Sequence, residues 1–207
     1  MNYPIPENEP ARLNTLRGYG ILDTHPEDRF DELTWLAASI CGTPISKLSL
    51  VDEDRQWFKS KIGMEVCQTP RNDAFCSYAI MSPELFVVPD ASMDQRFAAN
   101  PLVLGEPHIR FYAAAPLVAP NGHILGALCV IDRVPRQLNQ DQLESLRILS
   151  HQVMAQAILA KNLHDLRTAL KDREDLEHDM EELIQDLQES RTREAFGPAH
   201  QRVKPRT

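Results

Sequence analysis

The feature that most constrains this chain is a long stretch without glycine or proline, from Arg136 to Phe196. Glycine and proline are the residues that most strongly disfavour helix interiors, so this stretch predicts one continuous helix from residue 139 onward. Leu143, Leu146 and Leu149 give its first turns an apolar side. A helix of about 55 residues is roughly 80 Å long, at about 1.5 Å per residue. That length exceeds a domain of ordinary size, so the distal half cannot pack on the domain.

The apolar residues of the distal half recur at heptad spacing, which predicts a coiled coil over residues 161–194. One seam position is shared by Leu159, Leu166, Arg173, Met180 and Leu187, and Ala169, Leu176 and Leu183 occupy most of the other. Asn162 and Arg173 interrupt the seam. A solvated single helix is the alternative, and pairing with a second copy is the main expectation. A polar tail is predicted at 195–207.

Two hairpins are predicted upstream of this helix. Residues 45–62 carry β-branched and apolar residues on both sides of an acidic turn at residues 52–54. The second hairpin is predicted over residues 110–132, around the strong turn signal Asn121-Gly122. Its returning strand, residues 123–131, is apolar almost throughout, which is typical of a buried strand.

Helical patterns precede the first hairpin. A short helix is predicted at residues 9–19. Thr24 and Glu27 have the spacing of a capping box, which predicts that a second helix begins there with Pro26 in its first turn. An apolar stripe follows, and Gly42 is the predicted terminator.

The segment between the hairpins is less regular. It predicts a short helix at residues 73–81, a brief strand at 85–88, and a long loop at 91–109 with one helical turn at 95–98. The order of elements is helix, helix, hairpin, helix, strand, loop and hairpin. Strands and helices that follow one another in this way predict an α+β fold with an antiparallel sheet.

Composition excludes several classes of function. The 207 residues include 22 basic and 30 acidic side chains, a net charge of −8, which argues against a nucleic-acid-binding surface. No apolar run is long enough to span a membrane, and the N-terminus lacks the pattern of a signal peptide. We therefore expect a cytoplasmic protein that binds neither nucleic acid nor membrane.

The four cysteines form no CxxC pair, and no histidines lie near them at metal-ligand spacing. We expect Cys41, Cys67, Cys76 and Cys129 to be free thiols, as is usual in a reducing compartment. No Ser-His-Asp arrangement, phosphate-binding glycine loop or pair of catalytic carboxylates is recognisable, so no enzyme is expected.

Four segments in this order carry a family resemblance: RQWFKSKIG, TPRNDAFCSYAI, NPLVLGEPHIRFYAAAPL and GALCVIDRVPRQL. They resemble bacterial GAF sensor domains, in particular the subgroup that opens with a YGILDT-type segment. The resemblance implies a central antiparallel sheet of five or six strands, with helices on one face and a small-molecule pocket on the other. It also implies a homodimer formed through the N-terminal and C-terminal helices, whose coiled coil carries signals to an output such as a kinase or cyclase.

The resemblance divides the chain into four parts: a lead-in and N-terminal helix at residues 1–24, the GAF domain at 25–160, the signalling helix at 161–194 and the tail at 195–207. No kinase, cyclase or DNA-binding module follows the helix within these residues. An output is therefore expected from a partner or from a part of the protein outside the chain.

By the same resemblance, a small ligand would be held non-covalently on the sheet and closed in by the middle helix and the 90–110 loop. The candidate lining residues are Trp57, Phe75, Cys76, Tyr78, Asp90, Phe97, His108, Arg110 and Tyr112. Trp57 and Phe75 could instead be plain core, His108 could be solvated, and Arg110 could pin the loop by pairing with Asp90 or Asp94. The alanines at 113–115 leave space for a cavity.

The ligand is not identified by these residues: a cyclic nucleotide, a tetrapyrrole, an amino-acid derivative or none remain open, and the cofactor is unknown. The subgroup usually carries His where this chain has Tyr78, and covalent bilin attachment tends to use a Cys-His pair, so that reading is disfavoured. Two other functions stay open. One is a ligand-free GAF dimerisation scaffold, and the other is a thiol-dependent methionine sulfoxide reductase using Cys67 and Cys76.

Overall fold

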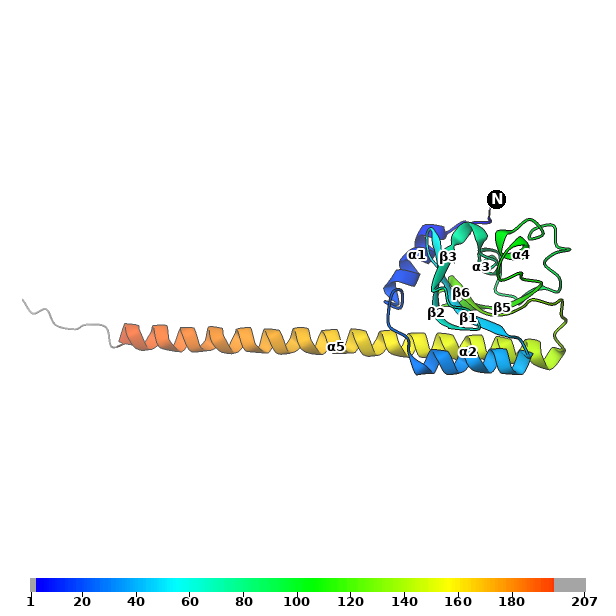
Figure 1. Ribbon diagram of the computed structural model, residues 1–207. Coiled ribbons are helices and arrows are strands. Elements are labelled where there is room, and N and C mark those ends of the chain that lie inside the picture. Colours follow the sequence, from blue (N-terminus) through cyan, green and yellow to red (C-terminus); the bar gives the residue numbers. More distant parts are fainter. Residues whose placement is uncertain (1–2, 196–207) are drawn as a thin grey trace, which may run out of the picture. The chain divides into compact units, whose positions relative to one another are not determined.

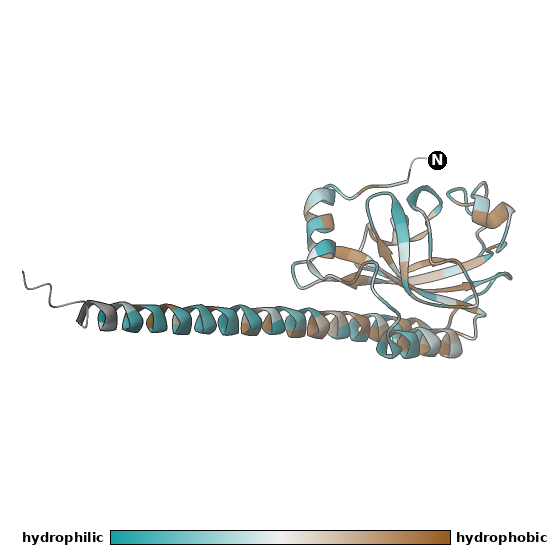
Figure 2. Ribbon diagram, turned by 60° about the vertical axis from the view of Figure 1, so that its left-hand side comes forward, coloured by the Kyte–Doolittle hydropathy of each residue, from teal (hydrophilic) through white to brown (hydrophobic). Residues whose placement is uncertain are grey.

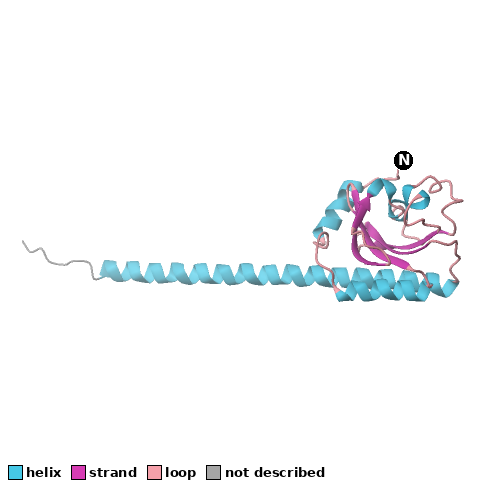
Figure 3. Ribbon diagram, viewed as in Figure 1, coloured by secondary structure: helices cyan, strands magenta, loops and turns pink. Residues whose placement is uncertain are grey.

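The computed structural model describes residues 3–195 and contains six strands and a set of helices (Figures 1 and 3). In chain order the elements are α1 (Glu9–Gly18), α2 (Asp28–Cys41), β1 (Ile45–Val51), β2 (Arg55–Ile62), β3 (Gln68–Pro70), the 3₁₀ turn η1 (Arg71–Asp73), α3 (Cys76–Ala79), β4 (Phe86–Val88), α4 (Pro101–Leu104), β5 (Phe111–Val118), β6 (Ile124–Asp132) and α5 (Gln140–Ala195). The described chain divides into two compact units, one up to residue 161 and one from residue 162.

The strands form one antiparallel sheet in the order β3-β2-β1-β6-β5-β4. Both predicted hairpins are present, as β1–β2 and β5–β6, and the turn of the second contains Gly122 at a φ of 83°. The α+β class and the antiparallel sheet predicted from the sequence are therefore confirmed. β1 and β6 lie in the middle of the sheet, so their residues reach the interior on both faces.

Gly126 explains how closely these two central strands approach. A Cβ atom at this position would lie 1.9 Å from the backbone oxygen of Ser49 on β1. A β-bulge interrupts the β1–β2 pairing at Leu48 and Ser49, next to the same point. Glycine is thus required here by close backbone approach, a common reason for glycine within a strand.

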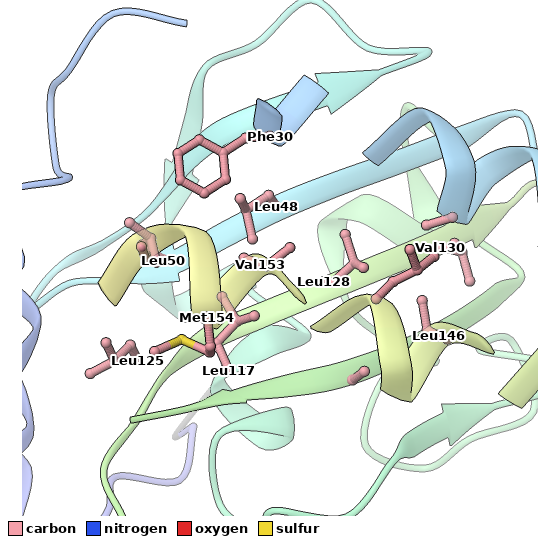
Figure 4. Close-up of a cluster of buried hydrophobic side chains, with 14 of the residues drawn as sticks. Phe30, Leu48, Leu50, Leu117, Leu125, Leu128, Val130, Leu146, Val153 and Met154 are labelled. Carbon is pink, nitrogen blue, oxygen red and sulfur yellow. The ribbon is translucent and has the colours of Figure 1, made fainter. Parts of the chain in front are cut away.

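One face of the sheet is covered by α2 and the first turns of α5, and α1 lies at the ends of the strands, where Thr15 and Arg17 contact His123 and Glu53 in the two hairpin turns (Figure 1). Figure 4 shows this core, in which Phe30 from α2 and Val153 from α5 pack with Leu48 and Leu128 from the central strands. All four side chains are almost completely buried. Burying an apolar side chain of this size contributes roughly 1.5–3 kcal/mol, so this face supplies a large share of the stability.

The opposite face is covered by α3, α4 and the segments around them. A second apolar cluster lies there, built from the other side chains of β1, β5 and β6 together with α3 and the 91–109 segment. The helices are thus divided between the faces: long ones on the first, and short ones that form a roof on the second (Figure 3).

Three local predictions need correction. α2 begins at Asp28, so the capping box is wrong: Thr24 Oγ1 donates to the Ile21 carbonyl and accepts from the buried Lys59 ammonium. Lys59 thereby holds this segment out of the helix. The predicted helix at 73–81 is shorter, and the 91–109 loop contains α4, which the sequence did not predict. Asn100 caps α4 by accepting from the Leu102 N–H.

α5 is one uninterrupted helix of 56 residues, as predicted. In the unit from residue 162, apolar side chains such as Leu176, Met180 and Leu183 are exposed along a mostly hydrophilic helix (Figure 2). The predicted tail lies outside the described residues except for Ala195. Among residues 3–195, no helix is long and apolar enough to cross a membrane.

Candidate functional site

Five aromatic side chains fill much of the roofed face. Phe75 and Phe97 stack with ring centroids 4.0 Å apart, and Tyr112 lies 5.0 Å from Phe75. Tyr78 meets Phe97 edge-on at 4.9 Å, and Phe86 lies 6.1 Å from Phe97 and 6.0 Å from Tyr112. Aromatic pairs at these separations attract each other beyond their burial, so the cluster is a tightly packed core.

The sequence predicted that Phe75, Tyr78, Phe97 and Tyr112 converge, and the structure brings them together. It missed Phe86, which β4 places over Ala114 in direct register. Ala114 is fully buried and belongs to the same apolar cluster as Phe86, so this alanine packs beside an aromatic residue. The only sequence signal was the apolar run of β4 itself.

A group of three polar side chains lies beneath these rings. Cys76 Sγ is 2.9 Å from the Tyr112 hydroxyl and 3.3 Å from Cys129 Sγ, and the Tyr112 hydroxyl is 3.1 Å from Cys129 Sγ. All three side chains are fully buried. Cys76 belongs to α3, Cys129 to β6 and Tyr112 to β5, so the group joins the roof to two strands of the sheet.

The charge beside this group comes from Lys47 on β1, whose Cα lies directly opposite that of Cys129 in the pairing of β1 with β6. Lys47 is only 4% exposed, and its ammonium lies 4.4 Å from the centre of the Phe58 ring. Within the described residues it makes no hydrogen bond or ion pair. A lysine with so little exposed surface and no such partner is unusual, because desolvation of a charge is costly.

The three groups titrate differently. Burial acts to raise the pKa of Cys76, but hydrogen bonds from Cys129 and Tyr112 and the charge of Lys47 lower it to about 6. Burial and the neighbouring sulfur groups raise the pKa of Tyr112 and of Cys129 well above their ordinary values. The hydrogen bonds and the charge of Lys47 therefore favour a thiolate within this pair.

A cavity of about 470 Å³ opens beside Lys47. It is lined by Ile45, Lys47, Gly63, Met64, Glu65, Val66, Thr69, Leu102, Glu106, Pro107, Ile109, Ile131 and Arg133. Its walls are mainly apolar, and its polar groups include the Lys47 ammonium and the Thr69 hydroxyl, whose oxygen is buried without a hydrogen-bond partner. Apolar walls with a few polar groups are typical of small-molecule sites, and the volume falls within their usual range.

The nine predicted site residues do not line this cavity. The sequence signal for it was a lysine at an inward position of an otherwise apolar strand, since Ile45, Lys47, Ser49 and Val51 alternate on one face of β1. The prediction followed the aromatic side chains instead.

Trp57 lies on the other face of the sheet. It is opposite Leu50 in the β1–β2 pairing and belongs to the core beneath α2. There it borders a separate cavity of about 510 Å³ together with Asp23, Lys59 and other residues. Phe58, the next residue, faces Lys47 on the roofed side. Since neighbouring strand residues alternate between faces, a shift of one residue decides which aromatic ring reaches the site.

The remaining predicted residues shape the loop above the site. Asp90 Oδ1 accepts from the backbone N–H and the hydroxyl of Ser92, at 3.0 and 2.6 Å. Arg110 pins the loop through the carbonyls of Val103 and Ile109, at 2.9 and 3.0 Å. These bonds replace the pairing with Asp90 or Asp94 that the sequence suggested. His108 is exposed, which agrees with the alternative prediction that it is solvated.

Cys67 and Cys76 are not brought together. Cys67 is exposed just before β3, whereas Cys76 is buried against Cys129. The pair of thiols considered for reductase chemistry is therefore absent from the described structure.

The model of the GAF domain family matches residues 25–157 of this chain. The chain belongs to the GAF domain family. Among curated proteins, this chain is similar to the protein named cyclic di-GMP phosphodiesterase PA2567 of Pseudomonas aeruginosa, with 42% identity over 180 residues. The match covers 86% of this chain and 31% of that protein, so the chain spans about a third of this relative's length.

Solved structures agree on the fold. The GAF domain of an Acinetobacter phosphoenolpyruvate-protein phosphotransferase matches with a TM-score of 0.56 and 18% identity, covering 75% of this chain and 96% of that one. Free methionine-R-sulfoxide reductase from Neisseria meningitidis matches with a TM-score of 0.53 and 14% identity, covering 79% and 98%. At these identities the similarity concerns the fold of the GAF domain alone.

Proposed function

We propose that this GAF domain is a sensor module that binds a small ligand non-covalently in the Lys47 cavity. The observation that carries the proposal is Lys47, a side chain that is only 4% exposed, borders an apolar cavity and has no hydrogen bond or ion pair among the described residues. A ligand that offers an anionic or strongly accepting group to Lys47 and an apolar body to Ile109 and Ile131 would satisfy both parts of the site.

The relay to the rest of the protein would run through the sheet. Lys47 and Leu48 are neighbours on β1, and Leu48 packs beneath α2 and α5 on the opposite face. Movement of β1 on ligand binding would therefore alter how these helices pack. We propose that the ligand favours one of two packings and that α5 carries this population shift.

The proposed homodimer has apolar surface available on α2 and α5, where Trp35, Ile40 and Ile148 are exposed. The two helices are adjacent, since the Gln142 side chain donates to the Ile40 carbonyl at 3.0 Å. A second copy packed on this surface, with α5 continuing as a parallel coiled coil, would cover these side chains.

For the output, the name of the Pseudomonas relative supports a partner or linked domain that degrades cyclic di-GMP. A kinase or cyclase output fits the same arrangement. In each case we propose that the GAF domain regulates the output and is not itself an enzyme.

The deciding experiment is native mass spectrometry of freshly purified protein, comparing wild type with Lys47→Met. We expect a retained small molecule on the wild type and its loss from the variant. Lys171→Met is the matched control, because Lys171 is an exposed lysine of α5 and does not line the cavity. Equal retention in both variants would place the ligand elsewhere, and an empty wild-type dimer would favour the dimerisation scaffold.

A further inference from the structure

Two thiols from distant parts of the chain face each other inside the GAF domain. Cys76 at the start of α3 and Cys129 in β6 have their sulfur atoms 3.3 Å apart. A disulfide bond has a sulfur–sulfur distance of about 2.05 Å, so an approach of about 1.2 Å would be enough to form one.

The surroundings distinguish this pair from the other two cysteines. Lys47 and the Tyr112 hydroxyl both stabilise a Cys76 thiolate, which is the nucleophilic form of cysteine. Burial raises the pKa of Cys41 to about 11, and no second thiol contacts it. Cys67 is exposed and likewise has no neighbouring thiol.

We propose that Cys76 and Cys129 are a reversible redox pair, which hydrogen peroxide oxidises to a disulfide. The Cys76 thiolate attacks one peroxide oxygen, the O–O bond breaks, and the hydroxide that leaves takes up a proton to form water. Cys76 is then a sulfenic acid. The Cys129 sulfur attacks the Cys76 sulfur, the S–O bond breaks, and the hydroxyl group leaves with the Cys129 proton as a second water. Two thiols and one peroxide thus give one disulfide and two waters.

The proposed route for peroxide to these fully buried thiols begins at the Lys47 cavity. Lys47 and Ile131 both line the cavity, and both flank Cys129: Lys47 is opposite it on β1, and Ile131 lies two residues further along the same face of β6. Hydrogen peroxide is only about the size of two water molecules. Local opening of the roof at α3 would complete the path.

The bond would fasten the roof to the centre of the sheet. Phe75 directly precedes α3 and Tyr78 belongs to it, so a covalent link at Cys76 would restrain the aromatic cluster against β6. The Tyr112 hydroxyl would lose its two thiol partners. Neither thiol of this redox pair lines the Lys47 cavity, so the pair goes beyond the proposed sensor function.

The test is peptide mapping of the full chain in a Cys67→Ser background, which removes the exposed thiol. Protein treated with hydrogen peroxide is alkylated in denaturant and digested with trypsin. We expect residues 72–96, containing Cys76, to be linked to residues 111–133, containing Cys129, with the loss of two hydrogens. Dithiothreitol should reverse the link, and Cys41 should remain a thiol throughout.

Two further measurements separate a redox pair from slow incidental oxidation. The rate of linkage should rise with pH to a plateau near pH 7, whereas an ordinary thiol would still gain about tenfold per pH unit there. Lys47→Met should slow the linkage at least several-fold at pH 7, and Lys171→Met, at an exposed lysine of α5, should not. In Cys129→Ser, dimedone should trap the Cys76 sulfenic acid.

The proposal fails if Cys76 and Cys129 stay reduced at peroxide doses that oxidise Cys67 in the wild type. It also fails if the two thiols oxidise no faster than Cys41. Neither result would bear on ligand retention in the native mass spectrum, so the two proposals can fail separately.

Discussion

Arg71 donates from Nη1 to the Glu9 carboxylate at 2.6 Å, which joins the start of the roof to α1. The same nitrogen bonds the carbonyls of Asp52 and Glu53 in the β1–β2 turn. Arg71 is 2% exposed, and its Nε and Nη2 atoms are buried without a partner. Glu9 therefore supplies the only carboxylate that pairs with this cation among the described residues, and it is also bonded by Arg12.

Glu9→Gln should destabilise the protein. It removes the negative charge that faces Arg71 and Arg12, both of which are buried. Breaking a buried ion pair on one side costs about 3–5 kcal/mol, and the partial exposure of Glu9 lowers our expectation to about 2–3 kcal/mol. Urea unfolding followed by circular dichroism measures the difference. Glu7→Gln, on an exposed residue just before α1, is the control and should change the free energy of unfolding by less than about 0.5 kcal/mol.

Glu9 also predicts a pH dependence of stability. Burial acts to raise its pKa, but hydrogen bonds and charge from Arg12 and Arg71 outweigh this and lower the pKa below 4.5. A carboxyl group with a lowered pKa in the folded state contributes stability above its unfolded pKa and loses it as the pH falls through the folded value. Between pH 5 and pH 3, wild type should therefore lose more stability than Glu9→Gln. Parallel curves for the two proteins would contradict this account.

Gly126→Ala should disrupt the centre of the sheet. The new methyl group would lie 1.9 Å from the Ser49 oxygen, and backbone atoms cannot move aside as a flexible side chain can. We expect a loss of at least about 3 kcal/mol in urea unfolding, at the upper end of overpacking effects. Gly18→Ala is the control, because a methyl group added there, at the end of α1, would have nothing within 4 Å of it. A folded, fully stable Gly126→Ala protein would refute the close approach.

Much of the fold follows from local sequence signals. Alternating apolar residues and the Asn121-Gly122 turn define the strands, and the absence of glycine and proline defines α5. The start of α2 could not be read in this way. The capping box at Thr24 is a valid local signal. However, Lys59, 35 residues further along the chain, donates hydrogen bonds to the Thr24 hydroxyl and the His25 carbonyl.

The sequence predicted the aromatic cluster in part, and it did not predict the Lys47 cavity. The aromatic residues Phe75, Phe97 and Tyr112 do converge, because family-like segments place them on the roof and the sheet. Whether they enclose a cavity depends on Phe86, whose position follows from the register of β4 on β5. The thiol pair likewise depends on long-range placement, since Cys76 and Cys129 are 53 residues apart. Spacing along the chain carries no signal for either relationship.

The coiled coil provides the last prediction. In the proposed pairing, Asn162 and Arg173 occupy seam positions, where a polar side chain lowers the stability of a coiled coil. Replacing both with Leu should tighten dimerisation by at least tenfold in Kd, measured by sedimentation equilibrium. Arg167→Leu is the matched control, because residue 167 follows the seam residue Leu166 and faces outward in that register.

The same double variant tests the relay. If the two polar residues keep two helix packings close in energy, their replacement should fix one packing and abolish any ligand-driven change in distance between spin labels on α5. A change that persists undiminished would show that the interruptions are not the switch. An unchanged Kd in the double variant would instead argue that residues 162–187 do not form the seam, since burying two added leucines per chain must favour association.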